Sequence, residues 1–190
     1  MEGAFIDINH ELIDACRKGN REAQFKIYKL YYKAMFNTCL RIVKDTAEAE
    51  DIMQESFLNA FQRLASYTGE GSFGSWLKRI VINNALDVLR KTKELLPLDE
   101  VNPDFPEVFE DNREEEIQYQ VNEIKIAMNQ LPGEYRIVLS LFLLEGYDHE
   151  EISEILQISN QLSRTRYSRA RQKLLSILKE KKMKNSYLFN

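Results

Sequence analysis

Residues 159–184 contain a block of basic side chains at a spacing suited to binding DNA. Nine Lys and Arg residues stand there against a single Glu, and the segment has helical periodicity. Arginine can bind guanine bidentately in the major groove, and lysine can pair with phosphates. The candidate DNA-reading residues, on or near one helical face, are Arg164, Thr165, Ser168, Arg169 and Arg171. The alternative is a solvated charged face with a basic tail.

A glycine-rich turn with aromatic neighbours is a second candidate site. Gly69, Gly71 and Gly74 fall close together. An aromatic wall can stack on an unstacked base, an amide can read its edge, and basic side chains can hold the backbone. The residues of these types around the turn and after it are Tyr67, Phe73, Trp76, Lys78, Arg79 and Asn83. The alternatives are that Phe73 and Trp76 anchor the turn in the core and that Asn83 satisfies a neighbouring backbone group.

A third group lies in the segment Ala49-Glu50-Asp51-Ile52-Met53-Gln54-Glu55. Asp51, Gln54 and Glu55 stand at i, i+3 and i+4, so their polar side chains share one face of a helix. Such a face can meet an Arg-rich partner helix. The alternative is a face that is merely solvated.

These groups must be positioned by helices, because nearly every periodic segment has helical spacing and no convincing alternating strand occurs. The first helices are expected over residues 12–19, 22–43 and 47–64, the third capped by Asp45 with Glu48, and a fourth from Ser72 or Ser75 to residue 93. The apolar residues of the second helix, three or four apart, are Phe25, Tyr28, Tyr32, Met35, Phe36, Cys39 and Leu40.

The second half of the chain predicts a helix-turn-helix. Pro132 suits the first position of a helix that buries Val138, Leu139, Phe142 and Leu143 and ends before Gly146. Asp148, with Glu151, can cap a short helix, and Ser159 or Asn160 begins the basic one. A short helix, a tight turn and a basic helix form the layout of a DNA-reading motif. The fold class is therefore predicted to be all-α.

Between the two halves the composition changes. Pro97, Pro103 and Pro106 break any helix, and residues 99–116 carry nine Asp and Glu against one Arg. We expect a helical domain over residues 1–94, an acidic, proline-containing linker over 95–114, and a second helical domain with a basic tail over 115–190. The net charge of −4 hides this segregation. A dense basic block attracts polyanions locally whatever the total charge.

The composition offers little for catalysis. His10 and His149 are the only histidines, and Cys16 and Cys39 are isolated, so we expect no metal site, no cofactor and no catalytic residue. There is no Walker-type loop and no Ser/His/Asp order. No signal peptide is visible, and the longest strongly apolar stretch, residues 138–144, is too short to cross a bilayer. A reduced cytoplasmic protein without membrane insertion of its own is expected.

Together the segments resemble the sigma factors of bacterial RNA polymerase. Asp-Ile-Met-Gln-Glu-Ser-Phe, from Asp51, is similar to the polymerase-binding stretch of sigma region two. Ser-Phe-Gly-Ser-Trp-Leu-Lys-Arg-Ile-Val-Ile-Asn, from Ser72, is similar to the promoter-melting stretch after it. Leu131-Pro132, Glu145-Gly146-Tyr147, Glu151-Ile152 and Ser168-Arg169-Ala170-Arg171 resemble region four of the extracytoplasmic-function group. The resemblance covers roughly residues 10–90 and 115–178, in the family's order.

The resemblance implies a non-catalytic initiation subunit that binds core RNA polymerase and promoter DNA. Asp51, Gln54 and Glu55 would contact the polymerase clamp, and Tyr67, Asn83 and the turn would hold a flipped base of the minus-ten element. Arg164, Thr165, Ser168 and Arg169 would face the minus-thirty-five element as duplex. Family members are commonly held by an anti-sigma factor. The linker would extend towards the polymerase's nucleic-acid channel.

The sequence departs from the family pattern at the helix-turn-helix, where Gln157 replaces a common glycine and Gln161-Leu162 replaces a usual Gly-Thr. We expect some strain in the turn and leave the promoter sequence open. The main alternative is a two-domain regulator whose first domain senses a ligand or phosphate. It explains the basic helix but not the glycine-rich turn followed by Lys78, Arg79 and Asn83. An enzyme or a helical adaptor finds less support.

Overall fold

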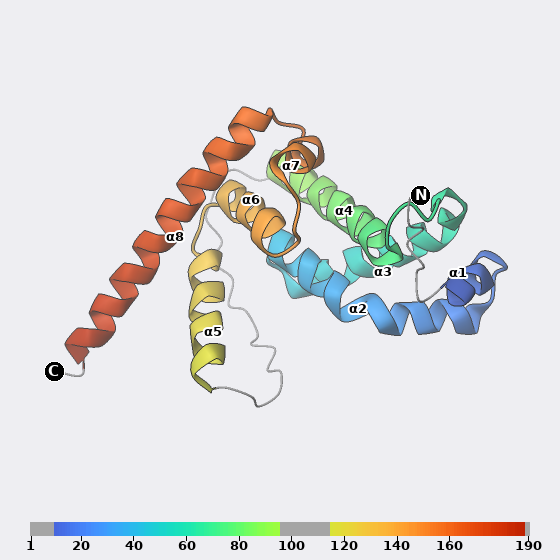
Figure 1. The fold of residues 1–190 in the computed structure, drawn as a ribbon, viewed down its shortest axis with the longest axis horizontal. Coiled ribbons are helices and arrows are strands. Elements are labelled where there is room, and N and C mark those ends of the chain that lie inside the picture. The colour runs from blue at the N-terminus through green and yellow to red at the C-terminus, as the bar shows by residue number, and fades with distance from the viewer. Residues whose placement is uncertain (1–9, 96–114, 189–190) are drawn as a thin grey trace, which may run out of the picture. The chain divides into compact units, whose positions relative to one another are not determined.

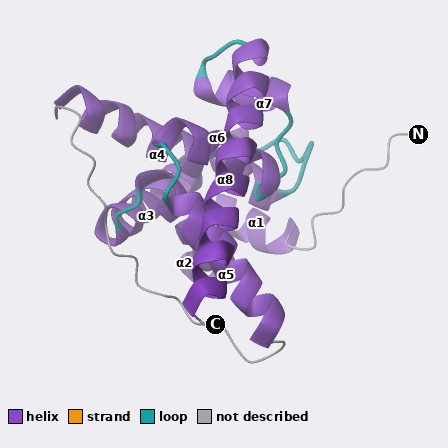
Figure 2. Cartoon of the chain, turned by 90° about the vertical axis from the view of Figure 1, so that its left-hand side faces the viewer, coloured by secondary structure: helices purple, strands orange, loops and turns teal. Residues whose placement is uncertain are grey.

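The computed structural model of the chain describes residues 10–95 and 115–188. All regular structure in these ranges is helical, which confirms the predicted all-α class (Figures 1 and 2). The chain divides into two compact units, Met1–Phe105 and Pro106–Asn190, and each is described by itself. The acidic segment predicted as the linker falls, apart from Leu95, outside the described residues.

Over its described residues, 10–95, the first unit contains four α-helices and a short 3-10 turn. They are α1 (His10–Arg17), α2 (Arg21–Val43), α3 (Thr46–Gln62), η1 (Leu64–Ser66) and α4 (Phe73–Leu95). Helices α2, α3 and α4 all pack against one another, and α1 covers part of α2. The side chains that fill the space between them include Ile27, Met35, Cys39, Ile52, Phe57, Leu77, Val81 and Ile82.

The starts of these helices are fixed by side-chain caps. The amide of Glu48 donates to Asp45 Oδ1 over 2.7 Å, as expected for α3. At α4 the amide of Ser75 donates to Ser72 Oγ over 3.1 Å, so Ser72 rather than Ser75 is the cap. Asn20 caps α2 through the amide of Ala23.

Not every aromatic residue at helical spacing on α2 enters the core. Phe25 is 56% exposed and Tyr32 is 37% exposed, whereas Ile27 is fully buried. The reason is that the buried face of α2 runs through Ala23, Ile27 and Met35. The aromatic residues lie along the edge of this face, where Tyr28 packs against Phe57 of α3 with 4.9 Å between ring centroids.

The second unit contains α5 (Glu115–Asn129), α6 (Gly133–Leu143), α7 (His149–Leu156) and α8 (Asn160–Leu188). Helix α8 packs against the other three. Consecutive residues of α6 from Arg136 to Leu141 are all buried. Exposure returns at its C-terminal end, where Leu143 is 52% exposed. The expectation that Leu143 is buried was wrong, while Val138 and Leu139 are buried as expected.

The helix-turn-helix formed by α7 and α8 has the predicted local chemistry. Asp148 and Glu151 form a complete capping box at the start of α7. The amide of Leu162 donates to Ser159 Oγ over 3.1 Å, so Ser159 caps α8. Gln157, between the two helices, has φ 55° and ψ 46°, in the left-handed region. This confirms the strain expected where a side chain replaces glycine.

Replacing Gln157 by glycine is expected to raise the free energy of unfolding by about 1 kcal/mol, because a left-handed conformation brings Cβ close to the next carbonyl oxygen. The side chain of Gln157 is exposed, so its loss removes little packing. Urea unfolding followed by circular dichroism measures the difference. Gln157→Ala is the matched control and should give no such gain. An equal gain from alanine would assign the effect to the side chain instead of the backbone.

Candidate functional site

The N-terminal half of α8 presents the predicted DNA-reading residues outward. Arg164, Ser168, Arg169 and Arg171 are exposed, and Thr165 is half-buried. Spacings of four and three residues place Arg164, Ser168 and Arg171 in one row. Thr165 and Arg169 form an adjacent row. The opposite face is buried through Ser163, Ala170 and Leu174.

The first turn of α8 adds residues that sequence reasoning treated only as departures from a pattern. Gln161 is exposed and precedes Arg164 and Thr165 by three and four residues, so it lies on the same face. Its amide is a group that can bind adenine bidentately. Leu162 is also partly exposed and could contact a thymine methyl group. Gln161 could have been predicted from the sequence, because it stands three residues before Arg164, a helical spacing that places both on one face.

Two contacts in this unit hold basic side chains in place. Arg164 Nε donates to Asn160 Oδ1 over 2.8 Å, which orients the guanidinium along the first turn of α8. Arg166 pairs with Glu134 of α6 over 2.7 Å, and its side chain is mostly covered. Arg166 is therefore paired within the unit, unlike Arg164, Arg169 and Arg171, which face outward.

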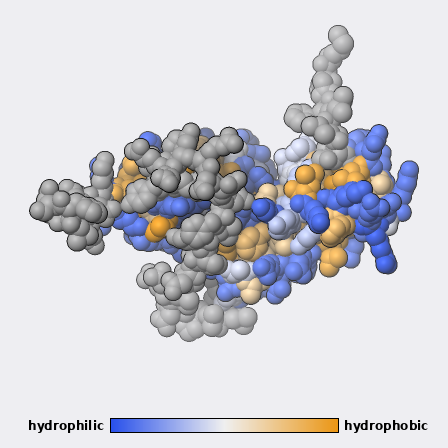
Figure 3. All heavy atoms as spheres, turned by 90° about the horizontal axis from the view of Figure 1, so that it is seen from below, coloured by the Kyte–Doolittle hydropathy of each residue, from blue (hydrophilic) through white to orange (hydrophobic). Residues whose placement is uncertain are grey.

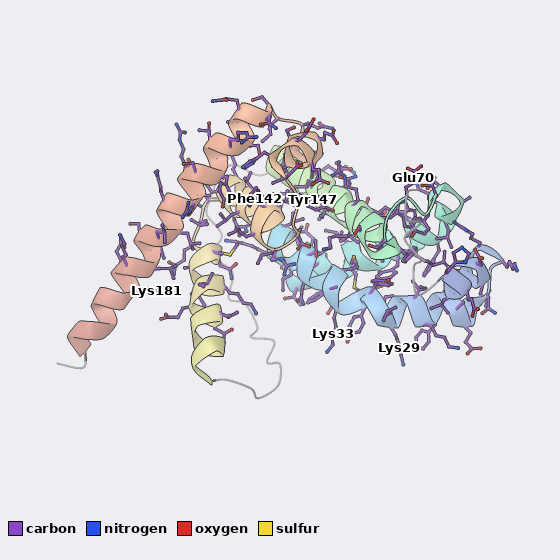
Figure 4. All side chains as sticks on the ribbon, in the orientation of Figure 1. Lys29, Lys33, Glu70, Phe142, Tyr147 and Lys181 are labelled. Atoms are coloured by element: carbon purple, nitrogen blue, oxygen red, sulfur yellow. The ribbon has the colours of Figure 1, made fainter. Side chains whose placement is uncertain are left out.

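His149 fixes the start of α7 against α8. Its Nδ1 lies 3.0 Å from the hydroxyl of Ser163, a residue with no exposed surface. Its ring stacks on Phe142 of α6, with ring centroids 4.8 Å apart. Phe142 is labelled in Figure 4. Tyr167 of α8 contacts both rings. Helix α8 is thus held against α6 and α7 by an aromatic cluster and one polar contact.

Acidification is expected to destabilise the second unit through His149. Burial and the charge of Arg164 lower the pKa of His149, an effect that the nearby Asp148 carboxylate partly opposes. Below about pH 6.5 the unfolded chain therefore binds more protons at this residue than the folded chain does, and stability falls as the pH falls. Urea midpoints at pH 7.5 and 5.5 measure this loss. Between these two pH values the urea midpoint of His149→Gln should fall less than that of the wild type. An equal fall of the midpoint in both proteins would contradict the prediction.

Two of the aromatic rings predicted to surround a base lie inside the first unit. Tyr67 is 7% exposed and Phe73 is 1% exposed. Tyr67, Phe73 and Trp76 form a triangle with centroids 5.4–5.5 Å apart, and Phe73 also meets Tyr31 of α2 at 5.6 Å. The Tyr67 hydroxyl donates to the carbonyl of Gly71 over 2.6 Å. These rings anchor the turn. Phe73 therefore lies in the core, as the alternative interpretation expected.

The turn itself and one face of α4 are accessible. Thr68, Gly69 and Glu70 are exposed, and Glu70 lies at the outer edge of the turn in Figure 4. Gly69 has φ +84°, a conformation that glycine adopts without strain.

The residues of α4 separate into an outward set and a packed set. Trp76, Arg79 and Asn83 stand at i, i+3 and i+7, which places them on one face. Asn83 is exposed and Trp76 and Arg79 are half-buried. Lys78 does not share this face, because residues two apart on a helix diverge. The neighbouring Asn84 is used inside the fold instead, since its amide donates to Ser56 Oγ of α3 over 2.9 Å.

The polar group on α3 lies at the surface together with an apolar residue. Asp51, Gln54 and Glu55 are all exposed. Leu58, seven residues after Asp51 and four after Gln54, is 63% exposed and continues the same face. Exposed apolar residues are not confined to α3, because the view from below in Figure 3 also shows residues in orange at the surface among hydrophilic ones in blue. Sequence reasoning missed Leu58, although its spacing from Gln54 and Glu55 was visible.

The described ranges contain no cluster of three or more His, Cys, Asp or Glu side chains that could hold a metal ion. Cys16 and Cys39 are buried thiols, and burial raises the pKa of Cys39 to about 12. Among the helices of residues 10–95 and 115–188, none is long and apolar enough to cross a membrane.

Comparison with known proteins shows where this architecture belongs. The family model of sigma-70 region 2 matches residues 27–94, and that of sigma-70 region 4 matches residues 122–174. The chain is 28% identical over 177 residues to the RNA polymerase sigma-H factor of Pseudomonas aeruginosa, covering 86% of this chain and 90% of that protein. It is 30% identical over 155 residues to the ECF RNA polymerase sigma factor SigM of Bacillus subtilis, covering 80% and 93%.

The fold has solved counterparts. One is the sigma factor RpoE from Bartonella quintana, crystallised in complex with the anti-sigma factor NepR. It matches with a TM-score of 0.58 and 21% identity, over 81% of this chain and 95% of that one.

The chain therefore belongs to the sigma-70 family of RNA polymerase sigma factors. Within it, the chain belongs to the extracytoplasmic-function group, since the matching relatives include named members of that group over most of their length. It is a sigma factor that directs transcription initiation.

Proposed function

We propose that this sigma factor binds core RNA polymerase through α3 and recognises its promoter at two elements. Helix α8 reads the minus-thirty-five element as duplex. The glycine-rich turn and α4 hold the minus-ten element as melted strand. The observation that carries the proposal is that Arg164, Arg169 and Arg171 all face outward on the second helix of a helix-turn-helix whose other face is buried. This is the arrangement in which such a helix places its side chains in the major groove.

The −35 assignment is supported by the side chains themselves. Arg164 and Arg169 can bind guanine bidentately, and Thr165, Ser168 and Arg171 can contact base edges or phosphates. Glu134 neutralises Arg166 but does not reach this face. The domain of residues 115–190 would act as the duplex-reading part, and the domain of residues 1–94 as the part that binds polymerase and melted DNA, with the acidic linker of residues 95–114 between them.

The −10 assignment is supported by the accessible surface beside the anchored turn. Trp76 offers a partly exposed ring, Arg79 a cation, and Asn83 an exposed amide with a donor and an acceptor. Tyr67 and Phe73 would support the pocket from inside, and Lys78 would act from another side of α4. A flipped base needs stacking, an edge contact and backbone neutralisation, and this surface offers all three.

The polymerase assignment is supported by the mixed chemistry of the α3 face. Two carboxylates, an amide and the exposed Leu58 stand on one helical face. DNA would be repelled by the carboxylates, whereas a basic amphipathic protein helix could pair with them and cover the leucine. We also propose that an anti-sigma factor holds this chain, as the related RpoE was crystallised with one, and that it acts in the cytoplasm without inserting into a membrane.

The deciding experiment is transcription by purified core polymerase with and without this protein. Templates come from the genes whose transcripts rise when the protein is overexpressed. We expect specific initiation that core polymerase alone does not give, together with weak binding of the free protein to the same duplex, because the acidic segments repel DNA. Absence of initiation combined with tight, sequence-specific binding by the free protein would instead favour the two-domain regulator.

A further inference from the structure

Helix α1 precedes the segment that the sigma region 2 model matches, which begins at residue 27. It is nevertheless part of the folded unit. Ile13 and Cys16 are buried, and α1 contacts both α2 and the 3-10 turn η1. The side chains on its other faces are therefore held in defined positions next to the start of the glycine-rich turn.

Arg17, the last residue of α1, makes a contact with a residue far along the chain. Its Nη2 donates to the carbonyl oxygen of Tyr67 over 2.6 Å, although fifty residues separate the two. Its Nη1 donates to Asp14 Oδ1 over 3.0 Å. The carboxylate of Asp14 thus orients the guanidinium towards Tyr67, and a bond from a charged donor is stronger than one between neutral groups.

Tyr67 is the residue at which η1 ends and the glycine-rich turn begins. Its hydroxyl donates to the carbonyl of Gly71, at the other end of the turn. Its ring packs against Phe73 and Trp76, with centroids 5.5 Å away in both cases. A contact that fixes the backbone of Tyr67 therefore also fixes the ring that supports Trp76.

We propose that Arg17 is a positioning residue for promoter opening: it holds Tyr67, and through it the turn and Trp76, in the arrangement that accepts the melted strand. The inference rests on the proposed role of this turn in binding the minus-ten element. A turn that is already ordered does not have to be ordered when the strand binds, so the contact favours capture of the base.

The test compares Arg17→Met, which keeps the apolar part of the side chain, with Arg17→Lys and with Arg21→Ala. Arg21 is exposed at the start of α2 and is a control for the loss of one positive charge near α1. Trp76 is the only tryptophan in the chain, so its fluorescence reports on the turn directly. Opening is followed in the complete holoenzyme by 2-aminopurine fluorescence in the minus-ten element, and strand capture by binding of a single-stranded minus-ten oligonucleotide.

We expect Arg17→Met to slow opening and to weaken oligonucleotide binding about tenfold, the effect of losing one charge-assisted hydrogen bond. Its Trp76 emission should shift to longer wavelength, with core binding unchanged. Arg17→Lys should recover part of the loss, and Arg21→Ala should resemble the wild type. Unchanged opening and emission in Arg17→Met would overturn the inference, as would a loss of core binding equal to the loss of opening. If the wild-type holoenzyme itself binds no melted strand, the proposed function fails instead.

Discussion

Replacing Asp51, Gln54 and Glu55 together by alanine is expected to weaken binding to core RNA polymerase about a hundredfold, since a few central residues usually dominate the affinity of an interface. The folded chain should tolerate the change. All three side chains are exposed, and substitutions at such positions usually change stability by less than about 0.5 kcal/mol. Binding of labelled core polymerase and thermal unfolding of the free protein measure the two effects separately.

The matched control removes two carboxylates and one amide elsewhere on the same unit. Glu11, Glu22 and Asn37 are exposed on α1 and α2 and can be replaced by alanine together. This control should bind core polymerase normally. If the Asp51/Gln54/Glu55 variant binds normally but unfolds at a much lower temperature, the α3 face is structural and the assignment is wrong.

Leu58 offers a second variant of the same surface. An exposed leucine contributes little to the folded monomer, so Leu58→Ser should leave its stability nearly unchanged. If a partner helix covers the leucine, the substitution should weaken core binding about tenfold. A normal affinity for Leu58→Ser would restrict the interface to the polar residues.

The features that the sequence predicted well are those decided by neighbouring residues. The box of Asp148 and Glu151 and the cap at Asp45 depend on groups three positions apart. The left-handed conformation at Gln157 agrees with the family resemblance, since Gln157 stands where the helix-turn-helix commonly has glycine. The all-α class follows from periodicity, because a helical repeat cannot place its apolar residues on one face of a strand.

The features that it predicted poorly depend on which helix covers which face. Phe25 and Tyr32 have the same spacing as buried residues, yet α3 and α4 cover the neighbouring face of α2. Asn83 and Asn84 are adjacent amides, and only the position of Ser56 on α3 shows which one is used inside the fold. Arg17 and Tyr67 lie fifty residues apart, so no local pattern could pair them.

Asn83→Ala is expected to impair promoter opening more than promoter recruitment, by about tenfold or more. Asn83 is exposed on the face of α4 that also carries Trp76, two helical turns from the end of the glycine-rich turn. Its amide can donate to and accept from the edge of an unstacked base. Because unstacking costs a few kcal/mol, the loss of a contact with the flipped base appears mainly in the melting step.

Arg169→Ala should have the opposite profile. Arg169 is exposed on the outward face of α8, in the second unit, and a bidentate contact with guanine contributes about 1–3 kcal/mol of discrimination. We therefore expect recruitment to duplex promoter to fall about ten- to a hundredfold. Initiation on a template supplied already melted should change little. Lys179→Ala is the control, since it removes one exposed charge of the same helix beyond residue 174, where the region 4 match ends.

The two variants are informative only together, on duplex and on pre-melted promoters, with recruitment and opening measured separately. A residue that holds the melted base remains necessary after pre-melting, so Asn83→Ala should still bind the pre-melted template more weakly than the wild type. Full rescue by pre-melting would instead place Asn83 in the step that drives melting. If both variants initiate normally on both templates, neither α4 nor α8 acts as proposed, because each would then have lost its central contact without consequence.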